Sequence, residues 1–235
     1  MIRASALAAL IASSLLVACG GGGNASGKGS APAGMSAFRY DLRQTSKGVL
    51  GTPPPGTEDP TIVVSVVGEV AGPKREHLVS TMSLGSSAVA LERIEYDDRA
   101  WSRDFGGKWT EDKPGGTGGM AGVRVSPALL GPEANARLKS ALEGLTSTEE
   151  KVADVDALHY TVPADKMRVV LGGSADNPVT TLGRVEGDSN LWVKKDGALP
   201  LRVTIDSRAP AGGETHVELV FKDHNTGDIK FGPPS

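Results

Sequence analysis

The segment from Asp188 to Lys222 constrains the fold most, because its apolar and polar residues alternate with the two-residue period of a β-strand. Three strands are predicted over 191–193, 199–206 and 216–222. An Asp-Gly turn between the first two is typical of a β-hairpin. This pattern predicts an antiparallel meander with one covered face and one hydrated face. The covered face, which must pack on a core or on an apolar ligand, comprises Leu191, Val193, Leu201, Val203, Ile205, Val217, Leu219 and Phe221.

Residues 1–18 have the features of a secretory signal peptide. Arg3 precedes a short apolar run that ends in Leu16-Val17-Ala18-Cys19, and the run is too short to span a bilayer. These four residues resemble the lipobox of bacterial lipoproteins, in which the cysteine is acylated and becomes the first residue of the mature protein. Because Cys19 is the only cysteine, a disulfide within the chain is excluded. The alternative is a plain signal peptide followed by an incidental or buried thiol.

The rest of the chain divides into a tether and one domain. Residues 19–37 are rich in glycine, serine and alanine, so we expect a flexible tether without a core. Residues 38–235 are long enough for a single domain with a sizeable core. The sequence predicts strands at 38–43, 61–70, 77–84, 88–96 and 152–162, a tryptophan hairpin over 99–110, and helices from Pro132 to Leu145 and over 165–171. Strands, then helices, then strands indicate an all-β or α+β domain.

No group of residues in the sequence predicts catalysis, a cofactor or a metal site. The four histidines are scattered, so each is interpreted as solvated or hydrogen-bonded. The segment from Asp223 to Asp228 resembles the start of a calcium loop, but Asp228 occupies the required glycine position. Residues 116–121 match a dinucleotide fingerprint in letters only. A net charge of −3 argues against nucleic-acid binding. We therefore expect a protein that is not an enzyme.

The lipobox-like cysteine, the tether and the closing meander together resemble the LppX/LprAFG group of bacterial lipoproteins and, more distantly, LolA and LolB. The residues that carry the resemblance are Trp101, Trp109, Val155-Asp156, His159-Tyr160, and Leu191-Trp192-Val193 through Val203. The resemblance implies an α+β fold with a curved, incompletely closed antiparallel sheet, a half-barrel, whose short helices pack across the concave face. It also implies an anchor of two or three acyl chains on Cys19, in the cell envelope, facing the periplasm or the outside.

The function implied by the resemblance is the binding of lipid in a cavity between sheet and helices, and its carriage across the envelope. Acyl chains need only a dry, apolar, concave wall. The predicted wall comprises Val64, Val66 and Leu84 from the first meander, Leu138, Leu142 and Leu145 from the helix, and Leu201, Val203, Ile205, Leu219 and Phe221 from the last meander. For each residue, plain core packing is the alternative. Two other functions stay open, a tethered interaction or sensor module and an enzyme whose residues converge only in three dimensions.

Overall fold

The computed structural model describes one unit of the chain. The described residues are 35–49, 60–104, 106–114, 125, 129, 131–177, 179–180, 182–195, 199–208 and 213–234, and they belong to the unit Pro32–Ser235. The predicted signal peptide, Cys19 and nearly all of the tether lie outside these residues. So do residues 115–124, 126–128 and the turn at 196–198.

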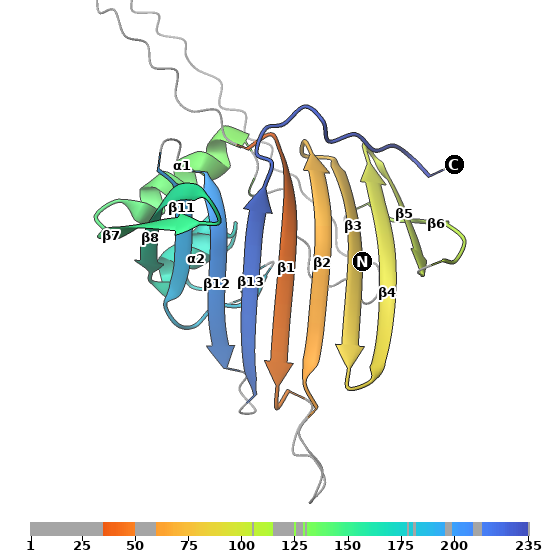
Figure 1. The fold of residues 1–235 in the computed structure, drawn as a ribbon, viewed down its shortest axis with the longest axis horizontal. Coiled ribbons are helices and arrows are strands. Elements are labelled where there is room, and N and C mark those ends of the chain that lie inside the picture. The colour runs from red at the N-terminus through yellow and green to blue at the C-terminus, as the bar shows by residue number, and fades with distance from the viewer. Residues whose placement is uncertain are drawn as a thin grey trace, which may run out of the picture. The chain divides into compact units, whose positions relative to one another are not determined.

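A single antiparallel sheet of 11 strands organises the described residues (Figure 1). Its order is β6-β5-β4-β3-β2-β1-β13-β12-β11-β8-β7, so that β6 and β7 form its two edges. The strands are β1 (Ala37–Lys47), β2 (Ile62–Ala71), β3 (Arg75–Leu84), β4 (Ser87–Tyr96), β5 (Arg99–Asp104), β6 (Thr110–Asp112), β7 (Ser147–Val152), β8 (Val155–Val162), β11 (Ser189–Lys194), β12 (Pro200–Arg208) and β13 (Glu214–Lys222). A separate pair is formed by β9 (Val179–Thr180) and β10 (Gly183–Arg184). The predicted α+β class and incompletely closed antiparallel sheet are confirmed.

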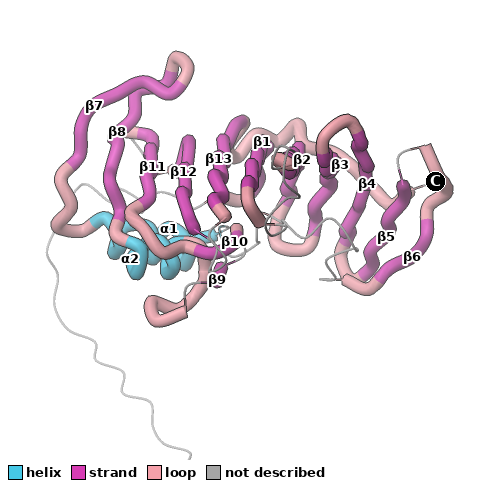
Figure 2. Tube along the Cα trace, turned by 90° about the horizontal axis from the view of Figure 1, so that it is seen from below, coloured by secondary structure: helices cyan, strands magenta, loops and turns pink. Residues whose placement is uncertain are grey.

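Two short helices lie on one face of the sheet, which we call the inner face. Helix α1 spans Gly131–Leu142 and helix α2 spans Ala164–Val170. Figure 2 shows both helices beneath the strands from β8 to β13, whereas β3 to β6 extend beyond them. The predicted helices are therefore confirmed, but they cover only one half of the inner face. Among the described residues, no helix is long and apolar enough to cross a membrane.

The first and last strands join the two meanders into one sheet, and their register produces a continuous apolar row on the inner face. Leu42 of β1 lies between Leu219 of β13 and Val66 of β2. The complete row, from β8 to β2, is Tyr160, Leu191, Val203, Leu219, Leu42 and Val66. Because residues of the same parity point to the same face of a strand, this row places the alternating apolar residues of both meanders on the inner face.

Beyond β2 the inner face is mixed, because Leu78 of β3 belongs to the buried apolar cluster, and Met82 of β3 and Leu91 of β4 pack against it. Ser80 of β3 continues the row from Val66. Arg93 of β4 is only 1% exposed, and its guanidinium donates hydrogen bonds to Asp112 Oδ2 at 2.5 Å and to the Lys113 carbonyl at 2.9 Å. A buried arginine is tolerated only with such partners. The buried, ion-paired Arg93 therefore interrupts the apolar layer on β4.

Two element predictions need correction. The sequence predicts a single strand from Val152 to Val162, but the structure has a hairpin, because Ser147–Val152 pairs with β8 as an edge strand. The predicted helix from Pro132 to Leu145 ends at Leu142, and the positive φ angle of Gly144 (76°) explains why it stops there.

Candidate functional site

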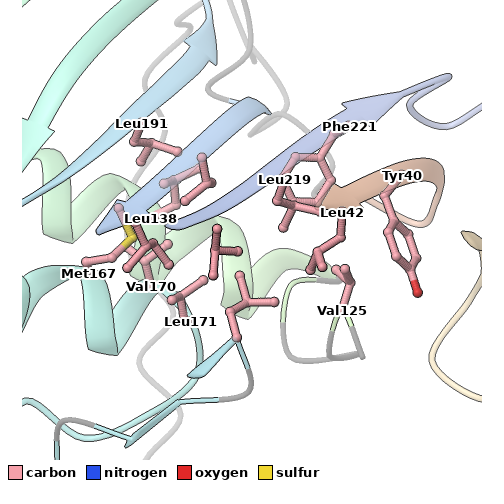
Figure 3. Packing of buried hydrophobic residues seen from close by; sticks show 14 of the residues in the cluster. Tyr40, Leu42, Val125, Leu138, Met167, Val170, Leu171, Leu191, Leu219 and Phe221 are labelled. Carbon is pink, nitrogen blue, oxygen red and sulfur yellow. The ribbon is translucent and has the colours of Figure 1, made fainter. Parts of the chain in front are cut away.

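The apolar layer between the helices and the sheet gathers most of the predicted cavity residues. One buried cluster contains Val64, Val66, Leu138, Leu142, Val203, Ile205, Leu219 and Phe221, and Leu145 packs against it half-buried. Leu201 is also buried, at 5% exposed. Figure 3 shows Leu138, Met167 and Val170 grouped below Leu191 of the sheet, with Leu219, Leu42 and Phe221 farther along the same layer. The sheet's alternation and the helix periodicity thus converge on one layer.

Two predicted cavity residues are not part of the cluster, the buried Leu201 and the exposed Leu84. Leu84 differs most from the prediction. It is 41% exposed and ends β3, opposite Ile62 of β2 and Ser87 of β4. Its parity places it on the inner face, but in the half of the sheet that the helices leave uncovered. The alternation thus predicts the face on which Leu84 lies, but it does not predict whether the helices cover that position.

The helices fill the layer themselves. Its internal cavity has a volume of about 20 Å³, which is room for about one water molecule. The sequence analysis missed the residues of the second helix that fill this space, namely Met167, Val170 and Leu171, and also Met35. The spacing of the three helical residues, i, i+3 and i+4, is the signal that could have identified them.

An open groove of about 540 Å³ adjoins this filled layer at the C-terminal end of α1. Its volume lies within the range of about 300 to 1,000 Å³ found for small-molecule sites. The groove is lined by Lys139, Ser140, Leu142, Glu143, Leu158, Tyr160, Val193, Lys194 and Lys195. Leu142 and Val193 belong both to the groove and to the buried cluster. The groove is therefore a continuation of the apolar layer that opens to solvent.

A second groove, of about 750 Å³, lies where β1, β12 and β13 meet the loop at Glu186. Its residues are mainly polar or charged, including Lys47, Asp206 and Arg208. His216 Nδ1 lies 2.7 Å from Asp206 Oδ1, and both side chains are at least half exposed. Solvated ion pairs of this kind contribute little free energy. This pair therefore does not form a buried polar site.

All four histidines have a hydrogen-bond partner, as expected. His77 contacts Glu92 at 2.9 Å, His159 contacts Glu150 at 2.8 Å, and His224 Nε2 lies 2.8 Å from the Pro200 carbonyl. Burial lowers the pKa of His224 despite that carbonyl. For Glu92, burial alone would raise the pKa, but hydrogen bonds from His77 and Arg103 outweigh it and lower the pKa. Within the described ranges, no three histidine, cysteine or acidic residues are placed to hold a metal.

The calcium-like segment after β13 is a turn whose carboxylates pair with the side chain of Arg39. Arg39 Nη1 donates to Asp223 Oδ2 at 2.8 Å and to Asp228 Oδ2 at 3.4 Å. The Thr226 amide closes the turn onto the Asp223 carbonyl at 3.4 Å. The carboxylates that a calcium ion would need are therefore paired with a guanidinium, which supports the interpretation of this segment as a polar turn.

Comparison with known proteins gives remote structural likenesses, including the following two. No family model matches the sequence, and no curated protein matches it. A LolA superfamily protein from Nitrosomonas europaea is similar over 83% of this chain and 88% of that one, at 10% identity and a TM-score of 0.27. MucB in complex with MucA(peri) is similar over 83% of this chain at 12% identity and a TM-score of 0.30. This chain spans only 55% of that MucB chain. Likenesses this remote carry no functional argument, and membership of the LppX/LprAFG group stays a prediction.

Proposed function

We propose that the chain is a lipoprotein of the cell envelope, anchored through acylated Cys19, that binds a lipid or another apolar ligand and carries it across the envelope. The observation that supports this best is the continuity between the apolar layer and the open groove. Leu142 and Val193 line both. An acyl chain that enters the groove would therefore meet the inner face without crossing a polar barrier.

Deeper binding requires α1 to give way, and the free energies allow it. Exposing a buried leucine side chain costs about 2 kcal/mol, whereas each buried methylene contributes about 0.8 kcal/mol. If α1 moves outward, the layer loses Ala134, Leu138, Ala141 and Leu142, at a total of about 6 kcal/mol. An acyl chain of about 14 methylenes could contribute about 11 kcal/mol in return, which exceeds that loss. The small internal cavity of about 20 Å³ then corresponds to the closed, unloaded state.

The same small cavity favours one other function, that of a non-enzymatic tethered interaction or sensor module. If α1 never leaves the sheet, the inner face under the helices is permanently filled. The protein would then act through its exposed surfaces, on a protein partner. This alternative keeps the membrane anchor and removes the lipid.

Native mass spectrometry of the full chain carrying Cys19→Ala, purified from a lipid-containing bacterial host, tests the ligand. We expect a stoichiometric adduct that extracts into organic solvent. Leu158→Trp should remove it, because Leu158 is a half-buried residue of the groove. Val155→Trp is the matched control, since Val155 lies on the same strand and is 37% exposed. A mass without adduct, unchanged after incubation with lipid, would support the interaction module.

The anchor is tested separately. When cells are labelled with palmitate, the wild-type chain should incorporate the label and sediment with membranes. The Cys19→Ala chain should do neither, because acylation on this thiol would supply the stable membrane attachment. Label on the Cys19→Ala chain, or none on the wild type, would overturn the assignment of the lipobox.

A further inference from the structure

The groove at the end of α1 combines an apolar floor with a cationic rim. The floor consists of Leu142 from α1, Leu158 and Tyr160 from β8, and Val193 from β11. Leu158 pairs with Val193 across β8 and β11, so these two side chains form adjacent parts of one wall. The opposite wall is the last turn of α1, which ends at Leu142.

The charge of this groove is opposite to that of the chain. Its lining contains three lysines, Lys139, Lys194 and Lys195, and a single glutamate, Glu143, whereas the whole sequence has a net charge of −3. Lys195 also contacts Glu149 Oε1 at 2.6 Å, in an ion pair whose side chains are 49% and 72% exposed. Because exposed pairs of this kind are weak, Lys195 can exchange this partner for another anion.

A fourth lysine, Lys166, offsets the partial negative charge at the carbonyl end of α1. The carbonyl end of α1 carries a partial negative charge, which would repel an anion at the groove. Lys166 Nζ of α2 donates a hydrogen bond to the Glu143 carbonyl at 3.1 Å. This contact satisfies one terminal carbonyl and places an ammonium group there.

We propose that the groove selects lipids with an anionic headgroup, whose acyl chain lies on the floor of the groove while the headgroup contacts Lys139, Lys194 and Lys195. This inference rests on the proposed function and specifies its ligand class. A neutral or zwitterionic lipid would gain the same apolar contacts, but its headgroup would have no net attraction to the rim. Charge complementarity thus distinguishes the headgroups where the apolar wall cannot.

The test compares two lysolipids that share a myristoyl chain, lysophosphatidylglycerol and lysophosphatidylcholine, below their critical micelle concentrations. Binding to the full chain with Cys19→Ala is measured by isothermal titration calorimetry. We expect the anionic lipid to bind about tenfold more tightly at low salt. This preference should shrink as salt is raised, because the rim is exposed and its charges are screened.

The triple variant Lys139→Gln, Lys194→Gln, Lys195→Gln should bind both lipids with the weaker affinity. A matched control with the same charge change is Lys74→Gln, Lys108→Gln, Lys230→Gln, whose lysines are exposed and lie outside the groove; it should keep the preference. Equal binding of the two lipids by the wild type overturns the anionic selection and leaves the proposed function standing. A preference that survives in the groove variant shows that the groove is not the site, whereas binding of neither lipid removes the proposed function as well.

Discussion

Replacing Gly68 by alanine should destabilise the fold strongly, although the change adds one methyl group. Gly68 of β2 pairs with Tyr40 of β1, whose ring lies over it on the inner face. A Cβ atom at position 68 would lie 2.2 Å from Tyr40 Cζ and 2.3 Å from Tyr40 Cε1. Ordinary contacts between carbon atoms are about 3.5 to 4.0 Å. One of the two side chains must therefore move.

The ring cannot move without cost, because it is buried and hydrogen-bonded. Tyr40 is 0% exposed, its ring centroid lies 6.0 Å from that of Phe38, and its hydroxyl donates to Glu76 Oε1 at 2.9 Å. Overpacking a core costs about 1 to 3 kcal/mol. Disturbing a buried hydrogen bond to a carboxylate adds about 1 to 3 kcal/mol. We expect Gly68→Ala to lower the free energy of unfolding by about 3 kcal/mol, out of about 5 to 15 kcal/mol for a typical domain.

Urea unfolding followed by tryptophan fluorescence measures this loss, and two comparisons isolate its cause. Gly227→Ala should change the free energy of unfolding by less than about 0.5 kcal/mol, because nothing lies within 4 Å of a Cβ atom built there. In a Tyr40→Leu background, Gly68→Ala should cost little, since the ring that it strikes is gone. Equal costs in the two backgrounds, or a near-neutral Gly68→Ala, would refute the steric argument.

Three further changes test other parts of the molecule. Burial lowers the pKa of His224 below its unfolded value of about 6.5, so below pH 6.5 the unfolded chain binds more protons than the folded one. The free energy of unfolding should therefore decrease as the pH is lowered from 6.5, by at most about 1.4 kcal/mol per pH unit. His224→Gln should remove this decrease, which urea titrations at pH 7 and pH 5 measure. Arg93→Leu should cost about 1 to 3 kcal/mol, because it removes the guanidinium that donates to Asp112 and to the Lys113 carbonyl; a cost below about 0.5 kcal/mol would contradict a structural role for this ion pair. Leu138→Ala should cost about 2 to 5 kcal/mol by the same assay, since Leu138 is 5% exposed between helix and sheet, whereas Ser140→Ala on the exposed side of α1 should be near neutral.

The closing meander could be predicted because its chemistry is local. Alternation at period two fixes both the strand and the face of each side chain, and Val217, Leu219 and Phe221 are all buried as that rule requires. The amphipathic helix was predictable for the same reason, at a different period. Neither rule specifies which strands a helix will cover, because that depends on contacts between distant segments. Leu84 shows the consequence, since it has the correct parity and remains 41% exposed.

The edge strand β7 escaped prediction for a different physical reason. Five of the six residues from Ser147 to Val152 are exposed, so they give no apolar periodicity. The strand forms because its backbone pairs with β8 through a tight hairpin in which Ala153 has a positive φ of 51°. Side chains support it from the outer face, where Glu150 accepts from Trp192 Nε1 at 2.8 Å. Backbone pairing of this kind leaves little trace in the residue types of an edge strand.

The division of the inner face into two halves determines where an apolar ligand could lie. If α1 moved away, the exposed apolar row would run from Tyr160 of β8 as far as Val66 of β2. Beyond Val66 the row continues through Ser80 of β3 to Leu91 of β4, and Leu78 of β3 lies in the same buried cluster. The polar groups on this path are Ser80 and the buried, ion-paired Arg93 of β4. Transferring a methylene chain onto these groups would strip their partners without gain. A ligand would therefore lie between the groove at β8 and β11, which already opens to solvent, and the buried Arg93 on β4.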